Sequence, residues 1–220
     1  MNQVIQGNSL ELMKDMPEKS IDYVFCSPPY NRKRNDKYKY YDDTIIDYFA
    51  LLRESINESL RVTKKHVFFN IQKNYYNKVD VNRIIGHFAE KIVEIIIWEK
   101  TNPMPAAGNA VTNSYEFFIV LGHTSLKSNT TYTKNIISTS VNGKMPESHK
   151  AVMKQEVANW FIEKFTNKGD IILDPFAGTG TTGVACKNLN RNFILIEKEQ
   201  EYIDIINKRL SSLDKSTDKE

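Results

Sequence analysis

The sequence has few of the residues that mark several protein classes. Two cysteines in 220 residues, Cys26 and Cys186, are too few for a disulfide scaffold, and both lie in or beside apolar segments. We expect them to be buried, reduced thiols. The four histidines are scattered, and no group of histidines and cysteines has the spacing of metal ligands, so we expect no metal.

Long apolar runs are also missing. No stretch approaches the ~18 apolar residues that a membrane-spanning helix needs. The first residues, Met1-Asn2-Gln3-Val4, lack the basic and apolar regions of a signal peptide. We therefore expect a cytoplasmic protein with no membrane partner. The formal net charge is only +3, which permits a nucleic-acid partner without requiring one.

Seven short runs rich in Val, Ile, Phe and Tyr predict strands, and helical patterns fall between most of them. The strands are expected at 3–7, 21–27, 66–72, 92–98, 115–121, 171–174 and 192–197. The helices are expected at 45–61, 81–91, 152–165, 180–189 and 200–210. This alternation predicts an α/β fold with a mostly parallel seven-stranded sheet and helices on both faces.

The length of the chain suits a single domain, which we place at residues 1–210. Residues 122–148 are rich in Ser, Thr, Asn, Lys and Gly and have no apolar period, so they predict a long loop. The polar residues 211–220 predict a disordered tail.

One predicted strand runs directly into a glycine-rich turn, Asp174-Pro175-Phe176-Ala177-Gly178-Thr179-Gly180, and a helix is expected to follow. Gly178 and Gly180 make positive φ angles accessible and let a ligand approach the backbone. Asp174 projects a carboxylate from the carboxyl end of the strand, where open α/β sheets bind ligands. The turn contains no lysine, so it does not predict a phosphate-cradling loop.

The next strand also ends in an acid, Glu197, which lies 19 residues beyond Gly178. Nucleotide-binding βαβ units present a carboxylate to ribose hydroxyls at about this distance. The acid that precedes the turn, Asp174, suits a ligand with a positive amine better than a pyrophosphate. Together these residues predict a nucleoside-containing cofactor.

A second strand, near 21–27, ends in Ser27-Pro28-Pro29-Tyr30. Together with the glycine turn and the two threonines that follow it, this motif resembles the S-adenosylmethionine-dependent DNA amino-methyltransferases, which methylate N4 of cytosine or N6 of adenine. Here the serine motif precedes the glycine motif, as in the circularly permuted β class of that family. This order argues against protein-glutamine methyltransferases and many RNA methyltransferases.

The resemblance implies a Rossmann-like methyltransferase fold, S-adenosyl-L-methionine as cofactor and double-stranded DNA as partner. The cofactor-binding residues that it implies are Asn8, His149, Asp174, Phe176, Gly178, Gly180, Thr181, Thr182 and Glu197. Asn8 stands where the family usually has an acid, and Lys150 follows His149 where the family usually has a proline. The stretch Trp98–Pro105 is similar to the family's segment before its target-recognition region, which implies a short target-recognition segment at 101–148.

The resemblance also implies catalytic roles for Ser27, Pro28, Pro29 and Tyr30. An exocyclic amine of a base is a poor nucleophile because its lone pair is delocalised. Hydrogen-bond acceptors on its two N–H groups, the Ser27 hydroxyl and the Pro28 carbonyl, would localise that lone pair. Two prolines fix φ and lack N–H groups, so they hold this carbonyl rigidly. Tyr30 would offer a face on which a flipped base stacks.

A basic loop, residues 31–43, follows the motif directly and predicts contacts to phosphates and bases. The residues expected to bind DNA are Arg32, Lys33, Arg34, Lys37, Tyr38 and Lys39.

Cytosine N4 is the favoured target, since Ser-Pro-Pro-Tyr is more often seen in cytosine-N4 enzymes and Asp-Pro-Pro-Tyr in adenine-N6 enzymes. Three alternatives stay open: an adenine-N6 DNA methyltransferase, an RNA amino-methyltransferase and a non-catalytic DNA-binding subunit. The intact Ser27–Tyr30 and Asp174–Gly180 motifs disfavour the last. A cognate restriction endonuclease and a second copy of the chain are partners that this class uses and that the sequence leaves open.

Overall fold

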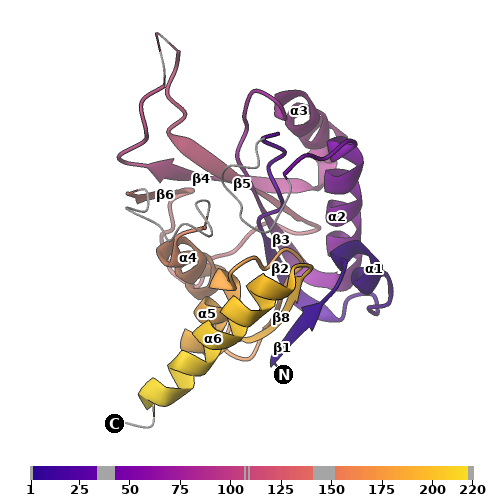
Figure 1. The fold of residues 1–220 in the computed structure, drawn as a ribbon, viewed down its shortest axis with the longest axis vertical. Helices are drawn as coiled ribbons and strands as arrows, with labels where there is room; N and C mark the ends of the chain where they lie inside the picture. The colour runs from indigo at the N-terminus through magenta and orange to yellow at the C-terminus, as the bar shows by residue number, and fades with distance from the viewer. Residues whose placement is uncertain (1, 34–42, 107, 109, 141–151, 218–220) are drawn as a thin grey trace.

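A computed structural model describes residues 2–33, 43–106, 108, 110–140 and 152–217. Within them, eight strands form one sheet in the order β1-β8-β7-β2-β3-β5-β4-β6 (Figure 1). Their bounds are β1 Asn2–Gln6, β2 Ile21–Cys26, β3 Thr63–Ile71, β4 Ile92–Lys100, β5 Tyr115–Gly122, β6 Ile136–Thr139, β7 Ile171–Asp174 and β8 Asn192–Glu197. Only β5 runs antiparallel to its neighbours. The mostly parallel α/β sheet is confirmed.

The sheet has one strand more than the seven predicted, because β6 lies inside the segment expected to be a loop. It pairs in parallel with the end of β4, from Ile97↔Ile136 to Lys100↔Thr139. The indole N–H of Trp98 donates to Thr139 Oγ1 across this pair at 2.8 Å. A four-residue edge strand buries little on either face, so its sequence carries no apolar period.

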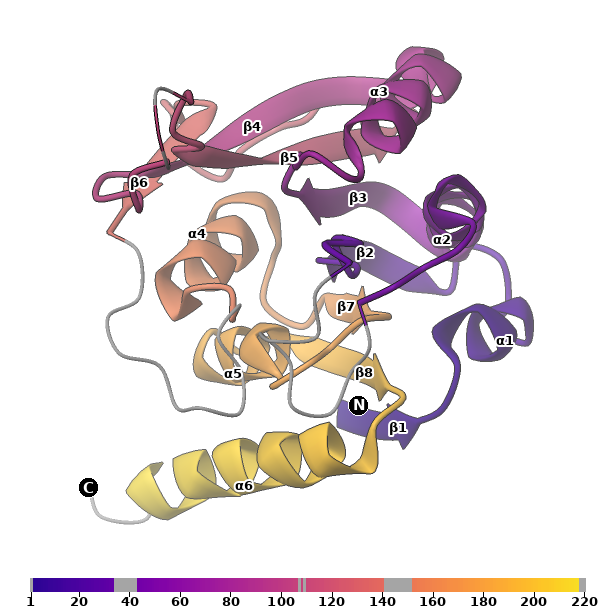
Figure 2. The ribbon, with the colours of Figure 1, turned by 45° about the horizontal axis from the view of Figure 1, so that its top comes forward.

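Helices cover both faces of the sheet (Figure 2). One face carries α1 (Ser9–Lys14), α2 (Tyr48–Val62) and α3 (Lys78–His87), and a short 3₁₀ helix, Ala89–Lys91, follows α3. The other face carries α4 (Gln155–Phe165), α5 (Thr181–Asn188) and α6 (Gln200–Thr217). The five predicted helices are present. The sequence did not predict α1, since six residues are too few to show a helical period.

The two faces hold separate apolar cores, because successive residues of a strand point to opposite sides. Phe25 of β2 packs with Phe118 of β5 and Phe161 of α4, and the ring centroids of the last two lie 4.1 Å apart. On the opposite face, Val24 lies in the cluster that contains Leu52 of α2. These clusters fix the sheet against both helical layers and so determine where its strand ends lie.

The expected disorder from Ser211 is wrong for residues 211–217, which continue α6. Leu210 is buried in the core, and Leu213, one turn later, packs against it. Asp214 pairs with Lys187 of α5 at 2.5 Å. One apolar residue per turn, here Leu213, is enough to pack the end of this helix against the core. A single leucine among polar residues does not produce a helical pattern in the sequence.

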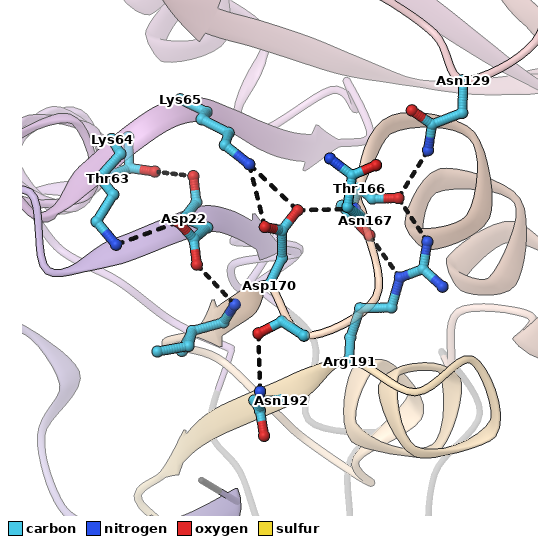
Figure 3. A network of polar contacts seen from close by, with 12 residues as sticks. Asp22, Thr63, Lys64, Lys65, Asn129, Thr166, Asn167, Asp170, Arg191 and Asn192 are labelled. Atoms are coloured by element: carbon cyan, nitrogen blue, oxygen red, sulfur yellow. Dashed lines mark hydrogen bonds and ion pairs between the residues drawn. The ribbon is translucent and has the colours of Figure 1, made fainter.

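A polar network ties the strands together at the edge where β2, β3, β7 and β8 begin (Figure 3). Asp22 accepts the backbone N–H of Ile171 at 2.9 Å and also pairs with Lys64. Asp170 accepts from Lys65 at 3.1 Å. These charge pairs and backbone hydrogen bonds fix the amino ends of the strands relative to one another.

No helix among the described residues combines the length and the apolar content that a bilayer crossing requires.

Candidate active site

A cavity of about 380 Å³ lies at the carboxyl ends of β1, β2, β7 and β8. β2 and β7 are neighbours in the sheet, which brings the serine motif and the glycine turn together. Most of the predicted site residues line this cavity: Asn8, Ser27, Pro28, Pro29, Tyr30, Asp174, Phe176, Gly178, Thr181, Thr182 and Glu197. The volume falls within the range of small-molecule sites in proteins.

Gly180 and the described basic residues do not line the cavity. Gly180 does not line the cavity but caps α5 with φ of +81°, and a Cβ atom there would lie 2.9 Å from Ile206. It therefore shapes the turn without facing a ligand. Arg32 and Lys33 follow the serine motif outside the cavity lining. Four residues predicted to contact DNA and one predicted to contact the cofactor lie outside the described residues: Arg34, Lys37, Tyr38, Lys39 and His149.

Two carboxyl groups accept hydrogen bonds from the backbone of the glycine turn. Asp174 accepts the backbone N–H of Phe176 at 3.0 Å and the Thr182 hydroxyl at 2.5 Å. Glu197 accepts the backbone N–H of Gly178 at 2.8 Å, and its other oxygen accepts the N–H groups of Lys198 and Glu199. A carboxylate offers about four lone-pair sites, so Glu197 retains the capacity to accept a further hydroxyl group.

The surroundings of Asp174 and Glu197 raise the pKa of both carboxyl groups. Burial raises the pKa of Asp174 to about 7, against the lowering effect of its hydrogen bonds from Thr182 and Phe176, and the negative Glu197 raises it further. Burial likewise raises the pKa of Glu197, while the backbone N–H groups that it accepts oppose the shift. Perturbed carboxyl groups in a concave pocket are typical of functional sites.

Asn8 uses its side chain to cap α1. Its Oδ1 accepts the backbone N–H of Leu10 at 3.0 Å. The oxygen that the resemblance assigned to the cofactor is therefore already engaged, although a carbonyl can accept a second hydrogen bond.

Support for the turn also comes from α6, which sequence reasoning missed. Arg209 Nη1 donates to the carbonyl of Thr179 at 2.6 Å, and its Nη2 donates to Gln155 Oε1 at 3.2 Å. Gln155 in turn donates to the carbonyl of Thr181 at 3.1 Å. Burial lowers the pKa of Arg209. An arginine on a polar helix carries no sequence signal for this role.

Ser27 and Tyr30 belong to a buried polar cluster behind the cavity. The Ser27 hydroxyl lies 2.9 Å from the Tyr30 hydroxyl and 3.0 Å from Asn70 Oδ1. The Tyr30 hydroxyl lies 2.5 Å from Asn70 Oδ1 and 2.8 Å from Glu116 Oε2. Glu116 is paired with Lys100. None of Asn70, Glu116 and Lys100 was predicted as a site residue, because they lie on β3, β5 and β4, far from the motif in the sequence.

The Tyr30 ring is only 7% exposed, and Arg32 lies over it at 5.6 Å from the ring centre. The backbone carbonyl of Tyr30 is also fixed, since Asn74 and Asn77 donate to it at 2.9 and 2.8 Å. The free stacking face expected from the sequence is thus largely covered. Arg32 pairs with Gln72 and is part of that cover.

Comparison with known proteins assigns the family. Residues 21–208 match the N6_N4_Mtase family, described as DNA methylase.

The chain belongs to this family. It is a DNA methyltransferase of the N4-cytosine or N6-adenine type and depends on S-adenosyl-L-methionine. This assignment favours DNA over the RNA alternative.

This methyltransferase is similar in sequence to two type II methyltransferases. The type II methyltransferase M.HinfI of Haemophilus influenzae is 27% identical, over 97% of this chain and 69% of its own length. M.MwoI of Methanothermobacter wolfeii, also a type II methyltransferase, is 32% identical, over 94% of this chain. The chain spans only 34% of the length of M.MwoI.

Solved structures agree on the fold. The complex of M1.HpyAVI with SAM is 28% identical and superposes with a TM-score of 0.71, over 96% of this chain and 99% of that one. The PvuII DNA methyltransferase, named as cytosine-N4-specific, is 18% identical, with a TM-score of 0.78 over 95% of this chain and 86% of that one. The Rossmann-like methyltransferase fold is therefore confirmed.

The cavity of the methyltransferase suits S-adenosyl-L-methionine. Glu197 provides spare acceptor capacity for hydroxyl groups, and the half-buried Phe176 provides an aromatic ring in the lining. Gly178, at φ of +51°, carries the backbone past the cavity without a side chain. When bound, the cofactor supplies an electrophilic methyl group, and the residues around it would hold and orient it.

The raised pKa of Asp174 predicts a pH dependence of stability. Its pKa of about 7 in the folded chain exceeds the ~3.9 of an unfolded aspartate, so the folded state binds more protons between pH 4 and 7. The contribution of Asp174 to stability is therefore present below pH 4 and is lost as the pH rises through 7. Asp174→Asn should remove this decline, which amounts to at most about 1.4 kcal/mol per pH unit. Urea unfolding at a series of pH values measures it, and an unchanged slope would contradict the shift.

The contact of Arg209 with the turn predicts a remote effect on the cofactor. Arg209→Ala should weaken binding of S-adenosyl-L-methionine about tenfold, because the Thr179 carbonyl loses a charged hydrogen bond that positions the turn. Lys208→Ala, which changes an exposed neighbour on the same helix, is the matched control. Calorimetric titration measures both, and equal affinities for the two variants would refute the role.

Proposed function

We propose that this methyltransferase methylates the N4 amine of a cytosine flipped out of double-stranded DNA. The observation that carries the proposal is the position of Ser27, which lines the same cavity as the glycine turn. The serine at the head of the motif supports cytosine over adenine by association within the family. Adenine N6 is the alternative target.

The proposed chemistry rests on acceptors that meet the amine. Ser27 Oγ and the Pro28 carbonyl would accept its two N–H groups, which localises the nitrogen lone pair for attack on the methyl group. Pro28 and Pro29 both have φ fixed by their rings, which holds the Pro28 carbonyl in one orientation. Positioning of the two reactants would supply much of the rate gain.

The proposed DNA-binding surface includes the basic loop 31–43 and a second segment, residues 73–78, that the sequence did not indicate. Asp43 accepts the backbone N–H groups of Asn31 and Arg32, each at 2.8 Å, which fixes the start of the loop. In the second segment, Asn74 and Asn77 bind the Tyr30 carbonyl. Tyr75 is 78% exposed, and the Lys78 ammonium lies 4.8 Å from its ring centre. Exposed cations and aromatic rings beside the catalytic motif suit a DNA backbone and its bases.

Further parts of the proposal concern domain organisation and partners. The domain would span residues 1–210, with target recognition by 101–148, and strands β5 and β6 occupy part of that segment. A short recognition segment suits a homodimer, in which a second copy extends the contact. The named relatives are type II methyltransferases, which supports a cognate restriction endonuclease as partner and the cytoplasm as location.

The test of this function is methylation of mixed-sequence duplex DNA with isotopically labelled S-adenosyl-L-methionine, followed by mass spectrometry of the nucleosides. We expect N4-methylcytosine, and a loss of the product in Ser27→Ala. N6-methyladenine would overturn the choice of base, and absence of label in DNA would overturn the proposal. Sequencing of the methylated positions then gives the recognition site.

The second segment predicts a specific salt dependence of DNA binding. The double variant Lys73→Ala/Lys78→Ala should bind duplex DNA more weakly and lower the slope of log K against log salt by roughly 2, since each phosphate contact contributes about 0.9. The matched control is Lys91→Ala/Lys168→Ala, which removes the same charge from the edge where the strands begin. Binding is measured by fluorescence anisotropy between 50 and 200 mM salt. Equal salt slopes for the two double variants would contradict the assignment.

A further inference from the structure

The hydroxyl groups of Ser27 and Tyr30 make three contacts with the acceptor atoms Asn70 Oδ1 and Glu116 Oε2 but have only two protons to donate. Each hydroxyl carries one proton. Asn70 Oδ1 lies within hydrogen-bond distance of both hydroxyls, and Glu116 Oε2 lies within that distance of Tyr30. The orientation of the two protons is therefore set by which neighbours can only accept.

Asn70 presents its oxygen to the hydroxyls. Its side chain is fully buried, and its Nδ2 donates to the carbonyl of Phe117 at 3.4 Å, which directs the amide oxygen toward Ser27 and Tyr30. An amide oxygen accepts and cannot donate. Asn70 is therefore fixed as an acceptor for Ser27.

Glu116 is the second fixed acceptor. It is 5% exposed, and its Oε1 forms an ion pair with the Lys100 ammonium group. A carboxylate accepts and cannot donate, so the Tyr30 proton is directed to it at 2.8 Å. Charge-assisted hydrogen bonds of this kind are about twice as strong as neutral ones.

Neither Asn70 nor Glu116 lines the cavity, so both hydroxyl protons are drawn away from it. Ser27, which does line the cavity, is left with a lone pair on that side. We infer that Asn70 and Glu116 are positioning residues that hold Ser27 as a hydrogen-bond acceptor and thereby select bases that carry an amine. This inference rests on the proposed function and names how its site distinguishes an amine from a carbonyl.

The consequence is a rejection of carbonyl bases. Cytosine presents an N–H group at the position where uracil presents an oxygen, and adenine and hypoxanthine differ in the same way. When the Ser27 oxygen, held as an acceptor, faces a carbonyl oxygen of the base, neither atom can donate a hydrogen bond to the other. Binding of the carbonyl base is therefore weakened. With the two protein acceptors removed, the Ser27 proton can turn toward the cavity and donate to that oxygen.

The test compares two duplexes that carry the recognition site, one with the target base and one with its carbonyl analogue. The pair is cytosine and uracil if the product is N4-methylcytosine, and adenine and hypoxanthine if it is N6-methyladenine. In both duplexes the base opposite the target is replaced by an abasic site, so that flipping is equally easy. Affinities are measured by anisotropy with the full chain and without cofactor turnover.

We expect the wild-type chain to prefer the amine base by at least about tenfold. The double variant Asn70→Leu/Glu116→Gln should reduce this preference several-fold, to the part that the Pro28 carbonyl still supplies, and it should bind the carbonyl duplex more tightly than the wild type does. A gain of affinity cannot arise from a misfolded variant. Glu116→Gln alone, which preserves shape, should give an intermediate preference.

The matched control is Asn70→Asp, which keeps an acceptor at the same position and should keep the preference. Retention of the preference in the double variant, or its loss in Asn70→Asp, would overturn the inference while leaving the methylation result intact. Absence of DNA methylation by the wild type would instead overturn the proposed function and, with it, this inference.

Discussion

The side of the cavity that bears the glycine turn depends on two carboxyl groups at the ends of adjacent strands, the buried Asp174 and the half-buried Glu197. Asp174 and Glu197 accept the backbone N–H groups of Phe176 and Gly178, and this holds a turn whose glycines have positive φ. A glycine turn has high conformational entropy when unfolded, so it needs such strong local bonds to adopt one shape. Burial of these two acids, which the contact with the turn requires, removes water from their carboxyl groups. This desolvation raises the pKa of both.

The side of the cavity that bears the serine motif is organised by a different kind of bond. Ser27 and Tyr30 follow β2, but their hydroxyls contact Asn70 on β3 and Glu116 on β5, and Glu116 is paired with Lys100 on β4. The antiparallel insertion of β5 between β3 and β4 brings these three strands side by side. The site is therefore assembled from two halves of the sheet, and β2 and β7 form the boundary between them.

Local signals in the sequence were sufficient for much of this arrangement. Strands β2, β7 and β8 were predicted because buried parallel strands are continuous apolar runs, and the Gly178 turn because glycine has a specific conformational use. The edge strand β6 and the last turns of α6 were missed, since each depends on a few tertiary contacts such as Leu213 against the core. The same limit applies to Asn70, Glu116 and Arg209. Their roles come from neighbours distant in the chain, and a polar residue on a strand or helix has no pattern that reveals such a neighbour.

The strand order has a consequence for synthesis of the chain. Among the strands that the structure describes, β1 pairs only with β8, and Asn2 and Phe193 are 191 positions apart. β2 meets β7 across a separation of 149 between Asp22 and Ile171. On a ribosome, the segment that bears Ser27 emerges before β7, so β2 lacks one of its two neighbours in the sheet until β7 has been made. An unpaired apolar strand edge is prone to association with other chains. The nascent segment that bears the serine motif is therefore a natural client for chaperones, and it gains its native partner strand only when β7 emerges.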